Sequence, residues 1–135
     1  MKKHFCVAIM VVVVVLLTAG MTTAANHKNM VGTWRGTVNF VGWNDSTGFY
    51  DTFYVFTYEI LSEDFTTGNF YGLQNGVNPF TGNVATNKTV TIIEYGGAGE
   101  YRILTGKVSG KKMSGTMQHF MSDQVDTGTF TFYKE

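Results

Sequence analysis

Apolar and polar residues alternate with a period of two over most of the chain from about residue 32 onward. Valine, isoleucine, threonine and aromatic residues fill the alternating segments, and glycine, asparagine and aspartate interrupt them at short spacing. This pattern is typical of β-strands joined by tight turns. We therefore predict strands at residues 32–43, 50–62, 69–74, 80–85, 89–95, 100–109, 112–122 and 127–134.

The number of these strands indicates the fold class. We predict an all-β fold, a single small antiparallel up-and-down barrel of about eight strands. A sheet of this size either closes or splits into a two-layer sandwich, and we favour closure because it removes unpaired strand edges. A barrel of about eight strands encloses side chains or one small ligand. The predicted barrel domain spans residues 32–135, after an N-terminal tail at residues 26–31.

The N-terminal residues carry a different pattern. Lys2 and Lys3 precede an unbroken apolar run at 5–17, and small residues follow at 22–25. A basic head, an apolar centre and a small-residue exit predict a secretory signal peptide at 1–25. An uncleaved anchor is the alternative, although the apolar run is shorter than the roughly 20 residues of a spanning helix. We expect a secreted or periplasmic protein that contacts a membrane only through this segment, if it stays uncleaved.

Alternation also assigns residues to the inner face of the predicted barrel, because successive side chains of a strand point to opposite sides. The inner set is aromatic and rich in methionine. Gly36 and Gly115 lie on the same faces, where the lack of a side chain permits tight curvature. The candidate ligand-binding residues are the inward-facing Trp34, Tyr54, Phe56, Tyr58, Met117 and His119.

Composition narrows the range of functions. Cys6 is the only cysteine and lies in the predicted signal peptide, so the barrel has no disulfide and no cysteine metal site. Basic and acidic residues are interspersed without a basic stripe, which argues against a nucleic-acid partner. The triplets that begin at Asn44 and Asn87 match the N-glycosylation pattern and are candidate modification sites.

No catalytic motif is present, and we expect no enzyme activity, no cofactor and no metal. His119 is the only histidine within the predicted strands, and no acid lies beside it in the sequence. Its imidazole shares a face with the thioethers of Met113, Met117 and Met121, and such groups can bind Cu(I). We favour the simpler interpretation that methionine fills an irregular barrel interior.

Acidic residues on or near the strands are candidates for paired acid–base chemistry. A retaining glycosidase needs two carboxylates about 5 Å apart, and spacing in the sequence does not establish such a pair. We interpret these acids as solvated residues of sheet edges and turns. They are Glu59, Glu63, Glu94 and Glu100.

The opening of the first predicted strand carries a family resemblance. The residues Gly32-Thr33-Trp34 resemble the Gly-x-Trp of the lipocalin and avidin-like barrels, grouped as calycins. The resemblance implies a barrel around a ligand cavity, with the indole packed across its closed end under a cation, Lys134 or Arg102. It therefore implies a secreted binding protein for a small apolar or amphipathic ligand or for a protein partner.

Two alternatives stay open. The turn from Gly96 to Arg102 is similar to the glycine-rich turn of allene oxide cyclase and dirigent barrels, which implies action on a bound hydrophobic intermediate. The other is an exported inhibitor or surface-interaction module, which would use the predicted loops at residues 44–49 and 75–79.

Overall fold

The computed structural model describes residues 28–44 and 48–135. The predicted signal peptide at residues 1–25 lies outside these ranges. Within them, no helix is long and apolar enough to cross a membrane.

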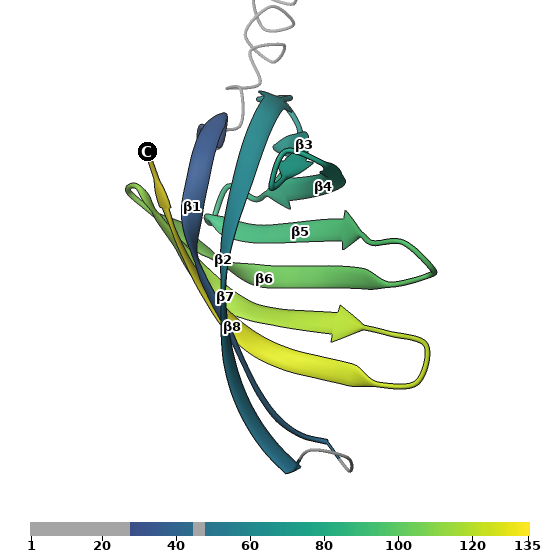
Figure 1. Ribbon diagram of the computed structural model, residues 1–135. Coiled ribbons are helices and arrows are strands. Elements are labelled where there is room, and N and C mark those ends of the chain that lie inside the picture. The colour runs from purple at the N-terminus through teal and green to yellow at the C-terminus, as the bar shows by residue number, and fades with distance from the viewer. Residues whose placement is uncertain (1–27, 45–47) are drawn as a thin grey trace, which may run out of the picture.

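Eight antiparallel strands form a closed barrel in which each strand pairs with its neighbours in sequence and β1 pairs with β8 (Figure 1). This arrangement confirms the predicted all-β barrel and excludes the two-layer sandwich. The strands are β1 (Gly32–Asn44), β2 (Gly48–Glu63), β3 (Asn69–Gln74), β4 (Asn78–Val84), β5 (Thr89–Tyr95), β6 (Tyr101–Ser109), β7 (Lys112–Phe120) and β8 (Val125–Lys134).

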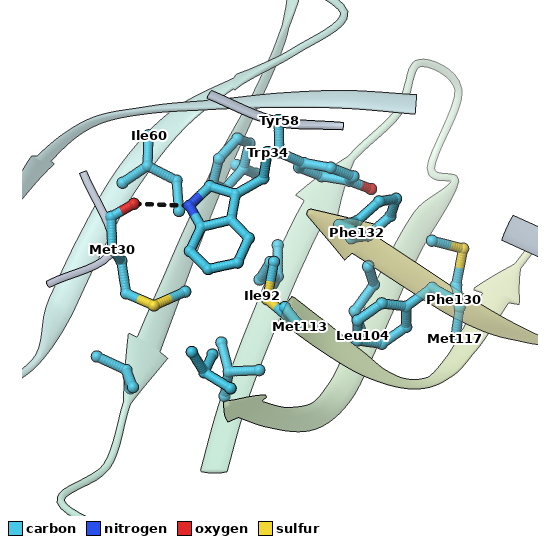
Figure 2. Close-up of a cluster of buried hydrophobic side chains, with 14 of the residues drawn as sticks. Met30, Trp34, Tyr58, Ile60, Ile92, Leu104, Met113, Met117, Phe130 and Phe132 are labelled. Carbon is cyan, nitrogen blue, oxygen red and sulfur yellow. Dashed lines mark hydrogen bonds between the residues drawn. The ribbon is translucent and has the colours of Figure 1, made fainter. Parts of the chain in front are cut away.

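One end of the barrel is closed by the chain that precedes β1. Trp34 and Met30 are both buried, and the indole Nε1 of Trp34 donates a hydrogen bond of 2.8 Å to the Met30 carbonyl oxygen (Figure 2). The Lys134 ammonium lies 5.8 Å from the centroid of the Trp34 ring, so it is Lys134 that covers the indole. Met30 N also donates to Glu63 Oε2 at 2.6 Å. The predicted N-terminal tail thus ends as a plug over this end of the barrel.

The interior between the two ends is filled by side chains. Tyr58, Phe80 and Phe132 pack together, with the Tyr58 ring centroid 5.2 Å from that of Phe80 and 5.0 Å from that of Phe132. A Cβ at Gly36 would lie 1.9 Å from the Thr131 carbonyl oxygen, which explains why this inward position carries glycine. The buried apolar core comprises residues from all eight strands and Met30.

The turn between β3 and β4 also holds β2. Asn75 and Gly76 both have positive φ, of 50° and 75°, as expected for this turn pair. The backbone amide of Asn75 donates to the Thr57 carbonyl oxygen at 2.7 Å. The side-chain Oδ1 of Asn75 accepts from the backbone amide of Thr57 at 2.9 Å. This contact marks the point at which β2 leaves β3.

Beyond that point the β1–β2 hairpin projects past the barrel wall. β1 pairs with β8 only from Trp34 to Phe40, and β2 pairs with β3 only from Tyr58 onward. The outer half of the hairpin therefore extends beyond the other strands (Figure 1). It forms one side of the second end of the barrel, which we call the open end.

Candidate functional site

The open end contains a cavity of about 380 Å³. This volume falls within the range of pockets that bind small molecules. One side comes from the β1–β2 hairpin, and the other comes from the ends of β6, β7 and β8 nearest to it. The lining residues are Phe40, Tyr50, Thr52, Tyr54, Phe56, Arg102, His119, Met121, Gln124 and Asp126.

Aromatic rings form the hairpin side of the cavity. Phe40 and Tyr54 meet edge to face with ring centroids 6.0 Å apart, and Tyr54 stacks on Phe56 at 6.1 Å. Phe40, Tyr54 and Phe56 occupy alternate positions that face the interior, as expected for strands whose successive side chains diverge. The result is a continuous apolar wall from the mouth toward the core.

A hydrogen bond ties β2 to β8 at the mouth, over Gly42 of the intervening strand β1. The Tyr50 hydroxyl donates to Asp126 Oδ1 at 2.5 Å, and Gln124 Nε2 donates to the same oxygen at 3.0 Å. The hydrogen bond to Asp126 raises the pKa of the Tyr50 phenol, because an ionised Tyr50 could no longer donate the proton that Asp126 accepts. Residues 76 positions apart in the chain are thereby joined at the site.

His119 lies on the opposite side of the cavity. Its Nε2 is 3.4 Å from Glu100 Oε2, and its ring centroid is 6.2 Å from that of Phe40. No acid adjoins His119 in the sequence, but the β6–β7 register brings the start of β6 beside the end of β7. The structure therefore supplies an imidazole–carboxylate pair that spacing alone did not indicate.

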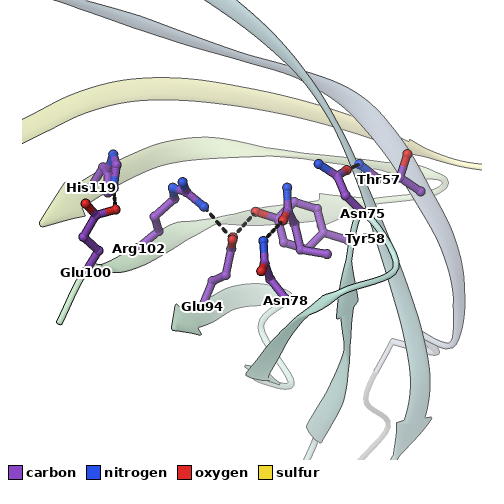
Figure 3. Close-up of polar contacts among 9 residues, drawn as sticks. Thr57, Tyr58, Asn75, Asn78, Glu94, Glu100, Arg102 and His119 are labelled. Atoms are coloured by element: carbon purple, nitrogen blue, oxygen red, sulfur yellow. Dashed lines mark hydrogen bonds and ion pairs between the residues drawn. The ribbon is translucent and has the colours of Figure 1, made fainter. Parts of the chain in front are cut away.

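A buried carboxylate pairs with Arg102, which is one of the lining residues (Figure 3). Glu94 has no exposed surface; its Oε1 accepts from Arg102 Nη1 at 2.5 Å and its Oε2 accepts from the Tyr58 hydroxyl at 2.9 Å. Burial and the neighbouring Glu94 raise the pKa of the Tyr58 phenol well above its usual range, against the opposing charge of Arg102. The Arg102 guanidinium also lies 5.6 Å from the Phe56 ring centroid.

The interpretation of Glu94 as a solvated acid was wrong. Val90, Ile92 and Glu94 alternate along β5 and all three are buried, so the period of two places this carboxylate inside the barrel. Buried charges require a partner, and Arg102 supplies it from the neighbouring strand. The alternation on β5 was the signal that would have identified it.

The six predicted ligand-binding residues divide into two groups. Tyr54, Phe56 and His119 line the cavity. Trp34, Tyr58 and Met117 are fully buried in the core, of which Trp34 belongs to the closed end (Figure 2). A contact of any of the six with a ligand stays a prediction.

Several lining residues were not predicted. Phe40 and Tyr50 share inward faces with Trp34 and Tyr54, so alternation carried the signal for both. The contribution of the β7–β8 connection depends on tertiary contacts that no local pattern encodes. The other lining residues outside the predicted ligand-binding set are Thr52, Arg102, Gln124, Asp126 and Met121, of which alternation had placed Met121 on the same face as His119.

Two further predicted features concern metal and sugar attachment. Among the residues that the structure describes, no three His, Cys, Asp or Glu side chains are placed to hold a metal ion. Asn87 is exposed in the turn between β4 and β5, and its Oδ1 accepts from the Thr89 amide at 3.0 Å. The triplet that begins at Asn44 continues into residues 45–47, outside the described ranges.

The closed barrel with Trp34 at its plugged end and a cavity at its other end is compatible with a calycin-like barrel. Comparison with known protein families and with curated proteins finds no match for this chain.

Proposed function

We propose that the protein is a secreted, calycin-like binding protein that holds a small apolar or amphipathic molecule at the open end of the barrel, without catalysis. The observation that carries the proposal is the cavity of about 380 Å³, with a wall of aromatic rings and a few polar groups. Apolar walls supply most of the affinity for such ligands, and a few polar groups orient them.

The division of the barrel into two ends supports this location. The closed end is plugged by Met30 and Trp34, and the middle is packed with side chains. The open end instead leaves Tyr54 about half exposed, at 49%. Covering an aromatic ring of this kind with a ligand removes apolar surface from water and is favourable.

A neutral fluorescent probe tests the proposal. N-phenyl-1-naphthylamine brightens in apolar surroundings, and we expect saturable binding of one molecule per protein. Thr52 lines the cavity, so Thr52→Trp fills the site and should weaken probe affinity at least tenfold. Thr129→Trp places the same ring at an exposed position on β8 and is the matched control, with unchanged affinity expected.

The titration also contains the result that would overturn the proposal. Probe binding that is absent from the parent protein excludes a ligand cavity for apolar molecules. Equal affinity in Thr52→Trp and Thr129→Trp, with both variants folded by circular dichroism, locates the binding elsewhere on the surface.

A second candidate function is an isomerase-type or dirigent-type barrel. It is supported by the His119–Glu100 pair and by Asp126, which place ionisable groups beside an apolar cavity. Such groups can transfer protons to and from a bound intermediate. Turnover of a recovered natural ligand by the parent protein, lost in His119→Gln with ligand binding retained, would favour this candidate over simple carriage.

A further inference from the structure

We propose that the ligand of the open end is an organic cation, a small molecule with an apolar body and an ammonium group. This inference rests on the proposed function, since it names the chemical class that the same cavity selects. It is carried by three features of the described residues: the distribution of charge between the two ends, the geometry around Asp126, and the neutralisation of Arg102.

The cations of the described residues are segregated along the barrel axis, whereas the acids are divided between its two ends. Cations gather toward the closed end, where burial lowers the pKa of the Lys134 ammonium and the nearby charges of Lys28 and Lys111 lower it further. The acids among the described residues of the open end and its hairpin are Asp51, Glu94, Glu100, Asp123 and Asp126. The cations toward the closed end are Lys28, Arg35, Lys88, Lys107, Lys111, Lys112 and Lys134, and the acids there are Glu59, Glu63, Asp64 and Glu135. Among the described residues the closed end is therefore net positive and the open end net negative. A cavity mouth with a net charge of one sign concentrates ligands of the opposite charge.

Asp126 is placed to receive an ammonium group. Its Oδ1 already accepts hydrogen bonds from Tyr50 and Gln124, whereas its Oδ2 takes part in no hydrogen bond within the described ranges. The carboxylate lines the cavity together with the aromatic rings of the hairpin. Aromatic faces attract cations through their quadrupole, and an acid beside them adds a direct charge partner.

Arg102 does not reverse this preference. It is the one arginine or lysine of the described open end, and its guanidinium is paired with the buried Glu94. Its position over Phe56 is itself a cation–π contact on the aromatic wall. The pair is neutral as a unit, so the unneutralised charge at the mouth is that of the acids.

Three probes with one apolar body distinguish the ligand classes. They are trimethyl(3-phenylpropyl)ammonium, 3-phenylpropan-1-ol and 3-phenylpropane-1-sulfonate, each titrated into the purified protein and followed by amide NMR shifts. We expect the ammonium probe to bind at least tenfold tighter than the alcohol, and the sulfonate to bind most weakly. The largest shifts should fall on the residues that line the open end.

Two charge-matched variants separate local recognition from general attraction. Asp126→Asn should bring the affinity for the ammonium probe close to that for the alcohol. Asp123→Asn removes the same charge from the exposed β7–β8 turn and should keep most of the preference. The probe ranking on the parent protein needs no variant, so a misfolded Asp126→Asn leaves the test intact.

The outcomes distinguish this inference from the proposed function. Equal binding of all three probes in the cavity, or tighter binding of the sulfonate, overturns the cation preference and leaves a ligand-binding barrel. Absence of shifts at the open end with every probe counts against both.

Discussion

At the scale of single residues, Glu94 links the core to the site. Its carboxylate is fully buried and holds Arg102 on one oxygen and Tyr58 on the other. Taking a charge out of water is unfavourable, and only a partner with good geometry offsets it. The two partners come from different strands, so the network holds Arg102, a lining residue of the cavity, against the buried core in one arrangement.

Removing the cation should expose the cost of this burial. We expect Arg102→Met to lower the free energy of unfolding by about 3 kcal/mol, at the low end for a broken buried pair because Arg102 is 22% exposed. The double variant Arg102→Met with Glu94→Leu should regain part of the loss, because it removes the unpaired charge but leaves the Tyr58 hydroxyl without its acceptor. Urea unfolding of both variants measures the difference, and a single variant as stable as the parent would contradict the account.

Tyr58 predicts a specific sensitivity to alkali. Its phenol has a pKa raised well above 10.0 in the folded state, so it stays protonated there while an unfolded chain releases its proton near pH 10. The stabilisation from Tyr58 is therefore complete below about pH 10 and is lost as the pH rises, at about 1.4 kcal/mol per unit.

Substitution should remove this part of the pH dependence. Tyr58→Phe leaves Glu94 Oε2 without its donor and should destabilise the protein by about 1–3 kcal/mol at neutral pH. Between pH 10 and 11 its stability should fall less steeply than that of the parent. Urea midpoints at pH 9, 10 and 11 check this, with Tyr133→Phe on the outer face as control; equal slopes for Tyr58→Phe and the parent would refute it.

At the scale of elements, the strands were predictable and their register was not. Alternation located every strand, and on β1, β2, β7 and β8 it also assigned the inner face, since burial on one side dictates a period of two. The inner face of β5 was missed, because Glu94 was interpreted as a solvated acid. Alternation also missed strand ends: β2 begins at Gly48 and β7 ends at Phe120, so Met121 lies beyond its strand. The contact from Tyr50 to Asp126 depends on barrel closure, which no local segment encodes.

Close approach of neighbouring strands should make an inward glycine indispensable. A Cβ at Gly36 would overlap the β8 backbone, so Gly36→Ala should lower the free energy of unfolding by about 3 kcal/mol. A Cβ at Gly97 would meet open space, and the φ of Gly97 is not positive, so Gly97→Ala should change it by less than about 0.5 kcal/mol. Comparable losses in thermal unfolding for the two variants would show that strand contact at Gly36 is looser than described.

At the scale of the whole molecule, the barrel has two unlike ends. Met30, Trp34 and Lys134 plug one end, and the projecting hairpin and the β7–β8 connection frame the other. The Gly-x-Trp at the start of the first strand predicted the plugged end. The resemblance implied a cavity but did not identify its walls, which come from residues distant in sequence. The cavity is therefore a property of closure rather than of any motif.

The most direct test of the account is methionine-methyl NMR of the protein during titration with N-phenyl-1-naphthylamine. Met121 lines the cavity, whereas Met30 and Met113 are buried toward the closed end. The account predicts that the Met121 methyl signal shifts and saturates with the probe, and that the Met30 and Met113 signals stay in place. Saturable shifts of Met30 or Met113 with an unchanged Met121 signal would contradict it.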